Sequence, residues 1–274
     1  MTFNTQLNLV FIFLILNLLH TFSLFPQEEI IFRSGQPVHS FNILSSHYQF
    51  LTRENTASAC MVDFSFVTAA FGNQFLLKEL MEKNVSSFFR IRENILTVQM
   101  DHFGYSRYGD IRLSGGYGRL FGQSVAVGMR FHYLLNHAYL YPARHSFTFD
   151  LSFQALIARK YGIGVMVYNP AKLKYGFTGR DIIPMQFNVN VFYLLNDRLL
   201  LWGKMEKELP GGFDLSIGIS RQWKMMILNG SISLTYFSLS GKVRWGAFEF
   251  EIQSKYHYRL GFSPALAIHY LFKS

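Results

Sequence analysis

Eight charged or imidazole side chains lie on the polar face of segments in which apolar and polar residues alternate. They are Arg130, His132, Asp150, Lys204, Glu206, Asp214, Glu249 and Glu251. If these segments enclose a pore, such residues line the lumen and tune what passes. In a narrow, filled lumen they pair with one another and hold the wall together instead, and a barrel of ~12 strands lies between filled and open barrels. Arg130 with Asp150 is the expected pair, because the two lie on neighbouring segments in matching phase.

These residue types do not form a catalytic or metal-binding motif. Nine histidines are present, but there is no His-Glu-x-x-His and no Cys/His pair, and His132, His137 and His145 span a strand and a loop. The segment Gly115-Gly116-Tyr117-Gly118 lacks a phosphate-loop lysine and lies inside a strand, where glycine relieves crowding in a curved wall. We therefore predict a protein that is not an enzyme, with no metal and no cofactor.

The composition favours a membrane barrel. Among 274 residues there are 29 phenylalanines, 15 tyrosines and a single cysteine, Cys60, so no intrachain disulfide can form. After the first 25 or so residues, no apolar run approaches the ~18 residues that a membrane helix needs. Aromatic residues form girdles at both lipid–water interfaces of membrane barrels. The net charge of +9 is spread along the chain, whereas proteins that track phosphates concentrate it on one face. Outer-membrane lipid, not nucleic acid, is the expected partner.

The amino-terminal segment resembles an export signal. Residues Leu7 to Leu19 form an apolar core, and Thr21-Phe22-Ser23 offers small residues to a signal peptidase. We predict a signal peptide over 1–25, removed between His20 and Gln27, although the first six residues contain no Lys or Arg. The alternative is an uncleaved anchor helix, for which this core is short.

Period-two alternation decides the fold class. Val125, Val127, Met129, Phe131 and Tyr133 alternate with Ala126, Gly128, Arg130 and His132, and the pattern recurs along the chain. A soluble sandwich shows alternation too. Here, however, the apolar face is large and aromatic, the opposite face is small or amide-bearing, and segments of about ten residues suit tilted membrane strands. We expect strands at 84–91, 94–103, 110–121, 124–135, 146–158, 161–169, 184–195, 198–207, 212–222, 227–237, 242–253 and 259–272.

Two further strands are expected between Ile43 and Phe71, giving an all-β, antiparallel transmembrane β-barrel of about 12–14 strands with an amino-terminal hatch-like segment. Tyr270 and Phe272 form the expected barrel-insertion signal at the carboxyl end. The long connections are 136–145 and 170–183. Counting twelve strands back from a periplasmic carboxyl terminus puts both on the periplasmic side, where short turns are normal, so the sequence assigns no sidedness.

Short motifs recur from Phe71 onward. They are Leu77-Lys78-Glu79-Leu80, His102-Phe103-Gly104-Tyr105 with Tyr108, Tyr117-Gly118-Arg119, Val127-Gly128, the run from His145 to Asp150, Gly164 to Tyr168 with Asn169-Pro170, and Leu260 to Pro264. Through these motifs the chain resembles FadL-type barrels, in particular the PorV/PorQ-like outer-membrane proteins linked to type IX secretion. Asn55-Thr56-Ala57 stands where the Asn-Pro-Ala motif of the family would be sought.

The resemblance implies a hatch in the amino-terminal region of the barrel. With the export signal, the predicted division is a signal peptide at 1–25, a hatch and first strands at 26–80, and an outer-membrane barrel at 81–274. Two functions follow from the resemblance. The first is a role in protein secretion as a type IX component or adaptor, or in envelope transport, with partner proteins docking on loops 136–145 and 170–183. The alternative is a passive channel or uptake barrel for small hydrophobic ligands. In both cases the chain is placed in the cell outer membrane.

Overall fold

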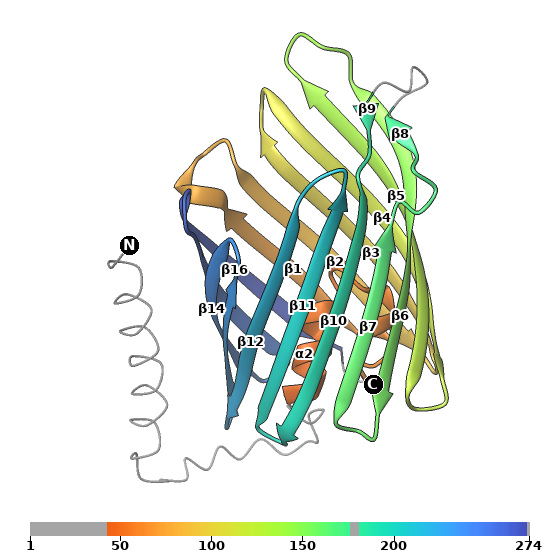
Figure 1. Ribbon diagram of the computed structural model, residues 1–274, viewed down its shortest axis with the longest axis vertical. Helices are drawn as coiled ribbons and strands as arrows, with labels where there is room; N and C mark the ends of the chain where they lie inside the picture. The colour runs from red at the N-terminus through yellow and green to blue at the C-terminus, as the bar shows by residue number, and fades with distance from the viewer. Residues whose placement is uncertain (1–42, 176–180, 273–274) are drawn as a thin grey trace. The chain divides into compact units, whose positions relative to one another are not determined.

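The computed structural model describes residues 43–175 and 181–272, and within these ranges fourteen antiparallel strands close into one barrel. The strands of the wall are β1 (Phe66–Asn73), β2 (Met81–Ile91), β3 (Asn94–Tyr105), β4 (Tyr108–Phe121), β5 (Val125–Ala138), β6 (Arg144–Ile157), β7 (Tyr161–Tyr168), β10 (Met185–Asn196), β11 (Leu199–Leu209), β12 (Phe213–Trp223), β13 (Met226–Ser233), β14 (Tyr236–Trp245), β15 (Phe248–His257) and β16 (Gly261–Leu271). Each pairs with its neighbour along the chain, and β1 pairs with β16 to close the ring (Figure 1). The predicted fold class is confirmed.

The alternation in sequence produces two unlike faces. On β6, Ser146, Thr148 and Asp150 are buried inside, whereas Phe147 on the outer face is 68% exposed. Ile252, on the far side of the ring, is 64% exposed on the same outer face. An apolar belt of this kind is stable only where lipid covers it, and a closed barrel leaves no unpaired strand edge in the lipid.

The strand count corrects the sequence prediction at two places. The two strands expected at 227–237 and 242–253 are three, β13, β14 and β15, because the chain turns at 234–235 and 246–247 and not at 238–241. The alternation of Ile232, Leu234 and Tyr236 continues through the first of these turns and hides it. The segment between Ile43 and Phe71 contributes one wall strand, β1, instead of two. Its earlier part is helical, since the small polar residues there pack inside the lumen and not in the wall.

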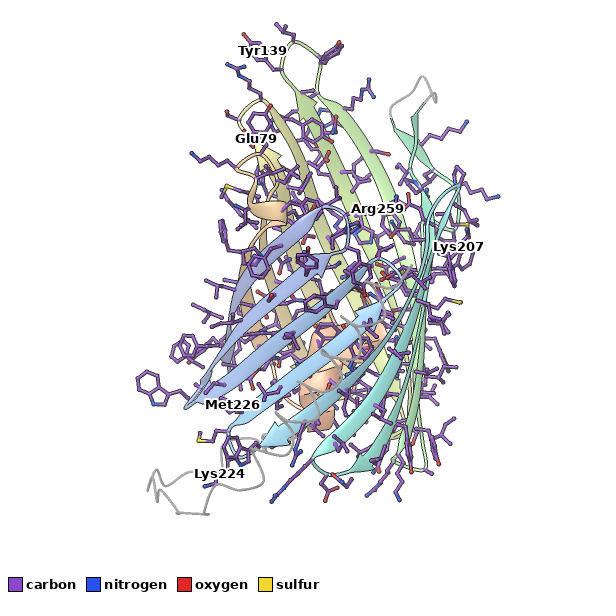
Figure 2. The ribbon with its side chains drawn as sticks, turned by 60° about the vertical axis from the view of Figure 1, so that its left-hand side comes forward. Glu79, Tyr139, Lys207, Lys224, Met226 and Arg259 are labelled. Atoms are coloured by element: carbon purple, nitrogen blue, oxygen red, sulfur yellow. The ribbon has the colours of Figure 1, made fainter. Side chains whose placement is uncertain are left out.

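The corrected count also places the connections. Strand β16 ends at the near end of the barrel, which we define by this terminus and by the turns that contain Glu93, Gln123 and Lys224. The connections from β5 to β6 (139–143) and from β7 to β10 (169–184) both lie at the opposite, far end. Figure 2 shows Glu79, Tyr139, Lys207 and Arg259 toward the far end, and Lys224 and Met226 at the near end. The conflict found by counting strands from the sequence therefore disappears.

The long β7–β10 connection contains two short strands, β8 (Lys174–Tyr175) and β9 (Asp181–Ile182), which pair with each other. Asn169 anchors its start, since its side-chain Nδ2 donates to the carbonyls of Leu173 and Ile183 at 3.0 and 2.8 Å. The expected loop 136–145 is shorter than predicted, because β5 continues to Ala138 and β6 begins at Arg144.

Residues 43–65, which we name the hatch, lie inside the lumen. The hatch contains helix α2 (Ile43–Leu51) and helix α3 (Thr56–Ala59). Its Gln49 contacts β14, and the carbonyl of its Arg53 accepts from Arg130 of β5 on the opposite side of the ring, so opposite walls enclose it (Figure 1). No helix among the described residues is long and apolar enough to cross a membrane. The predicted signal peptide lies outside the described residues.

Candidate functional site

Glycines in the wall make room for helix α3. All four of its residues are buried, and a Cβ added at Gly128 of β5 would lie 2.9 Å from the backbone nitrogen of Ala57. A Cβ at Gly118 of β4 would lie 2.6 Å from Sγ of Cys60. The sequence prediction that glycines in this segment relieve crowding is correct for Gly116, where an added Cβ would lie 2.5 Å from Oγ1 of Thr97 in the wall, and for Gly118, where the nearest atom belongs to the hatch. Gly115, on the outer face, has no atom within 4 Å of the same added Cβ.

Polar contacts hold α3 against these glycines of the wall. Asn55, the first residue of the Asn55-Thr56-Ala57 motif, caps the helix by accepting from the backbone nitrogen of Ser58 at 3.2 Å. The backbone nitrogen of Ala57 donates to Oγ of Ser152 at 3.1 Å, and Oγ of Ser58 donates to Gln154 at 2.9 Å. Small hydroxyl and amide side chains on β6 thus satisfy the donors of a helix that lies too close to the wall for larger residues.

Cations of the wall hold the hatch from several sides. Arg130 of β5 donates to the backbone carbonyls of Arg53 and Glu54 at 3.1 and 3.2 Å. Arg90 of β2 donates to the carbonyl of Cys60 at 2.8 Å, and Lys242 of β14 donates to Oε1 of Gln49 at 2.9 Å. Lys204 of β11 pairs with the carboxylate of Glu54 at 2.6 Å. These contacts hold the hatch in the near half of the lumen.

Two rings of helix α2 and two rings of β10 and β11 form an aromatic cluster between the hatch and the wall. We name it the aromatic shelf, and its members are His47, Phe50, Phe192 and Trp202. The ring centroids of Phe50 and Trp202 are 6.2 Å apart, and those of His47 and Phe192 are 5.0 Å apart. Phe50 remains 42% exposed although it lies inside the barrel. The shelf therefore places one exposed apolar ring, Phe50, and one partly exposed ring, Trp202, at the lumen, whereas His47 and Phe192 are buried.

Glycines on adjacent strands give the shelf its shape. A Cβ at Gly162 of β7 would lie 2.0 Å from the Phe192 ring, and a Cβ at Gly218 of β12 would lie 2.4 Å from the Trp202 ring. Each ring therefore lies flat over a bare stretch of backbone on the next strand. Burial lowers the pKa of His47, which packs on both rings, to about 3, so this imidazole is neutral.

The eight predicted site residues all lie on the inner face and fall into three groups. In the first, Nε of Arg130 donates to Oδ2 of Asp150 at 2.9 Å, so the expected pair forms, and His132 contacts the same oxygen at 2.9 Å. In the second, Glu249 accepts from Nε of Arg244 at 2.8 Å, and Glu251 lies 3.5 Å from Nζ of Lys242.

The third group surrounds Lys204, whose Nζ lies 3.0 Å from the Glu206 carboxylate in addition to its contact with Glu54. Asp214 is near this group and accepts from Oγ1 of Thr235 at 3.3 Å. The three groups are thus spread around the ring, and only the groups of Arg130 and Lys204 contact the hatch through the residues predicted from sequence.

Two chains of hydroxyl, histidine and carboxylate appear in the wall. Oγ of Ser114 lies 2.8 Å from Nδ1 of His132, whose Nε2 contacts Asp150. Thr68, His269 and Glu251 repeat the arrangement at 2.8 and 3.3 Å. A nucleophile and base in contact are necessary for acyl transfer, but an oxyanion needs free donors as well. The backbone N–H groups of β3, β4 and β5 are engaged in the ladder, and Asp150 is already neutralised by Arg130. We interpret both chains as support for the wall.

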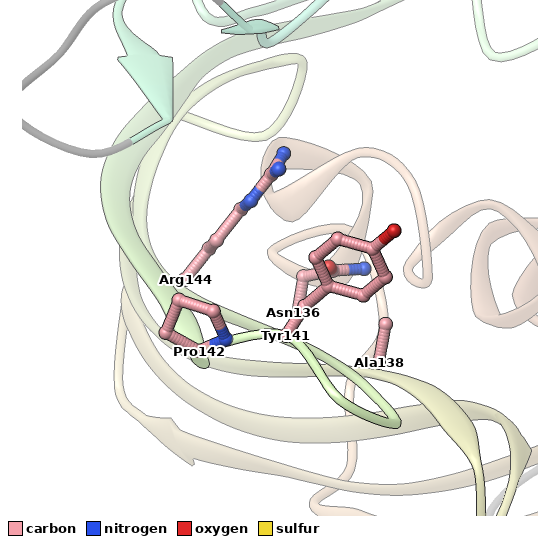
Figure 3. A pocket seen from close by; sticks show the side chains of 5 residues that line it. All are labelled: Asn136, Ala138, Tyr141, Pro142 and Arg144. Atoms are coloured by element: carbon pink, nitrogen blue, oxygen red, sulfur yellow. The ribbon is translucent and has the colours of Figure 1, made fainter.

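A small open cavity of about 220 Å³ lies at the far end, on the β5–β6 hairpin. It is lined by Asn136, Ala138, Tyr141, Pro142 and Arg144 (Figure 3). Beside it, Tyr139, Leu140 and Tyr141 at the hairpin tip are 65%, 85% and 69% exposed. Among the described residues, no group of three or more potential metal ligands comes together.

Several residues of the site are not apparent from the sequence. Glu54 and Phe50 belong to a segment expected to contain strands, and their partners on β11 lie about 150 residues away, so no local pattern links them. Asp101 and Arg112, which pair at 3.0 Å on β3 and β4, were also missed. Trp202 could have been placed in the lumen from the sequence, because it lies on the same inward face of one strand as Lys204 and Glu206.

The sequence matches no protein-family model and no curated protein. Solved structures with a similar fold exist. The toluene transporter TodX of Pseudomonas putida has a TM-score of 0.61 at 7% identity, with 81% of this chain and 92% of that chain covered. The toluene transporter TbuX of Ralstonia pickettii gives 0.59 at 8% identity, covering 81% and 93%. A FadL homologue of Pseudomonas aeruginosa gives 0.59 at 8%, covering 81% and 94%. None of these three is described as a secretion component, and at such low identity the likeness establishes that this chain has their barrel fold.

Proposed function

We propose that this chain is an outer-membrane barrel that takes up small hydrophobic molecules containing a ring, and that the hatch closes its lumen. The aromatic shelf carries the proposal, because Phe50 of the hatch and Trp202 of the wall present an apolar surface to the lumen. Binding sites for small molecules combine such apolar surfaces with a few placed polar groups. The apolar outer belt supports placement in a lipid bilayer.

The neighbours in structure support uptake over secretion. Their names describe transporters of toluene and a FadL homologue, which agrees with the FadL part of the sequence resemblance. The PorV/PorQ-like role in type IX secretion has no comparable support.

The exposed hairpin tip at Tyr139 to Tyr141 is the surface on which an envelope partner would dock, and co-purification with the tip residues changed to serine tests that role separately.

A reversible lock on the hatch tests the uptake proposal. Cys60 is the only cysteine, and a Cβ at Gly118 would lie 2.6 Å from its sulfur, so a Gly118→Cys variant brings two thiols together. We expect proteoliposomes with the wild-type protein to take up labelled toluene, oxidation of Gly118→Cys to stop uptake, and a reductant to restore it.

The matched control is Gly115→Cys, whose side chain points outward and cannot reach Cys60. It should transport equally in oxidising and reducing buffer. Uptake that continues through a variant whose disulfide has been verified by mass spectrometry contradicts a closing hatch. Absence of uptake by the wild-type barrel contradicts the function itself.

A further inference from the structure

The ion pair between Lys204 and Glu54 joins the wall to the hatch at the aromatic shelf. Nζ of Lys204 lies 2.6 Å from the Glu54 carboxylate of the hatch and 3.0 Å from the Glu206 carboxylate of its own strand. The Lys204 side chain is 11% exposed, whereas the Glu54 side chain is 42% exposed. The ammonium is therefore largely enclosed between two carboxylates, and the nearer of them, Glu54, comes from the hatch and is open to the lumen.

The ion pair lies beside the aromatic pair. Trp202 and Lys204 share the inner face of β11 at a separation of two residues, or about 7 Å along the strand. Phe50 and Glu54 are four residues apart on the hatch, so the hatch presents an aromatic ring to Trp202 and a carboxylate to Lys204. A molecule with a ring on the shelf and an anionic group on a short chain would span the same two positions.

We propose that the preferred ligand of the shelf is an aryl carboxylate, and that Glu54 occupies the place of its anionic group on Lys204. This inference rests on the proposed uptake function and names its substrate class. An enclosed ammonium strongly favours a carboxylate partner, so a ligand anion can exchange with Glu54, whereas a neutral hydrocarbon cannot.

The displaced Glu54 would not be left without a counter-charge. Arg53 and Lys255 are the other cations close enough to act on its carboxylate. When the ligand takes the place of Glu54 on Lys204, the hatch loses one of its contacts with the wall. Binding of the ligand therefore weakens the closed state. Lys204 acts here as the residue that determines specificity.

Binding of two matched probes tests the proposal. Phenylpropanoate and its neutral amide have the same ring and chain, so their affinities for the full-length protein in detergent, measured by calorimetry, isolate the charge. We expect the carboxylate to bind the wild-type protein more tightly. Lys204→Met should weaken carboxylate binding on the order of tenfold and leave amide binding unchanged. Glu54→Gln should strengthen carboxylate binding only, because its competitor is gone.

Glu93→Gln, in the exposed β2–β3 turn, is the control for Glu54→Gln and should change neither affinity. Equal binding of the two probes to the wild-type protein, or unchanged carboxylate binding in Glu54→Gln, overturns the proposal. The second result remains informative if Lys204→Met fails to fold. Toluene uptake measured in parallel separates the two ideas, since intact uptake with no preference for the carboxylate removes only the substrate class.

Discussion

Arg130 on β5 and Asp150 on β6 are joined by a hydrogen bond of 2.9 Å between Nε and Oδ2, and both side chains are at most 5% exposed. The same guanidinium reaches the hatch carbonyls of Arg53 and Glu54 and the amide of Gln99. One residue of the wall therefore both neutralises a buried carboxylate and holds the closed hatch. The charge pair therefore supports both the wall and the hatch.

Arg130→Met tests this double role. Removal of one partner leaves the Asp150 carboxylate buried with His132 alone, which we expect to cost roughly 3–5 kcal/mol of unfolding free energy. The double variant with Asp150→Asn should be less damaged than Arg130→Met, because no uncompensated charge remains. Heat-modifiable gel migration of the folded barrel measures both. Arg159→Met, in the exposed β6–β7 turn, should behave as wild type, and equal damage in the single and double variants argues against a charge effect.

Gly128→Val tests whether the absence of a side chain at this position allows the hatch to pack against the wall. The new side chain would enter the space of Ala57 and Thr56, so we expect the hatch to move away from the wall, at about 1–3 kcal/mol for the overpacking. Cys60 reports the movement, because burial raises its pKa to about 12, despite the opposing charge of Arg90, and keeps the thiol unreactive.

Maleimide labelling of Cys60 should therefore be slow in the wild-type protein and fast in Gly128→Val. Gly115→Val, which adds the same side chain to the outer face, serves as the control and should stay slow. Slow labelling of Gly128→Val in a correctly folded barrel would show that the wall, and not the hatch, absorbs the extra volume.

The wall could be predicted from sequence because period-two alternation is a local signal. In each segment from Val125 to Phe272 the alternation predicts which face meets lipid. The Arg130–Asp150 pair follows from the positions of the two residues on the inward face alone. A two-residue turn can leave the alternation unbroken, as it does across Ile232, Leu234 and Tyr236, and this is why β13 to β15 were predicted as two strands. The hatch could not be predicted in the same way. Its contacts with Gly118, Gly128 and Lys204 join distant parts of the chain, and α3 has only four residues, too few to show helical periodicity.

Phe272→Ala tests the carboxyl-terminal aromatics at the barrel seam. The Phe272 ring lies 5.2 Å from that of Tyr270 and 6.1 Å from that of Phe89 on β2, and its backbone nitrogen donates to the carbonyl of Ser65. Loss of these ring contacts should weaken the closure between β1 and β16 by about 1 kcal/mol. We expect a smaller folded fraction in the membrane by gel migration. Phe213→Ala, an outward aromatic away from the seam, is the control. Equal loss in both variants would assign the effect to lipid contact in general.

Acid should loosen the hatch through His47. Burial lowers the pKa of this imidazole from 6.5 to about 3, so between these values the unfolded chain binds a proton that the closed hatch does not. Stability is therefore complete above the unfolded value and falls as the pH decreases below it. At about pH 5, above the ordinary range of carboxylates, the loss amounts to at most about 2 kcal/mol. His47→Leu removes the proton site and keeps an apolar contact with Phe192 and Trp202. Hydrogen exchange of the α2 amides, corrected for the intrinsic effect of pH, should rise with acid in the wild-type protein and stay nearly flat in His47→Leu. The same acid response in both proteins would exclude His47 as its source.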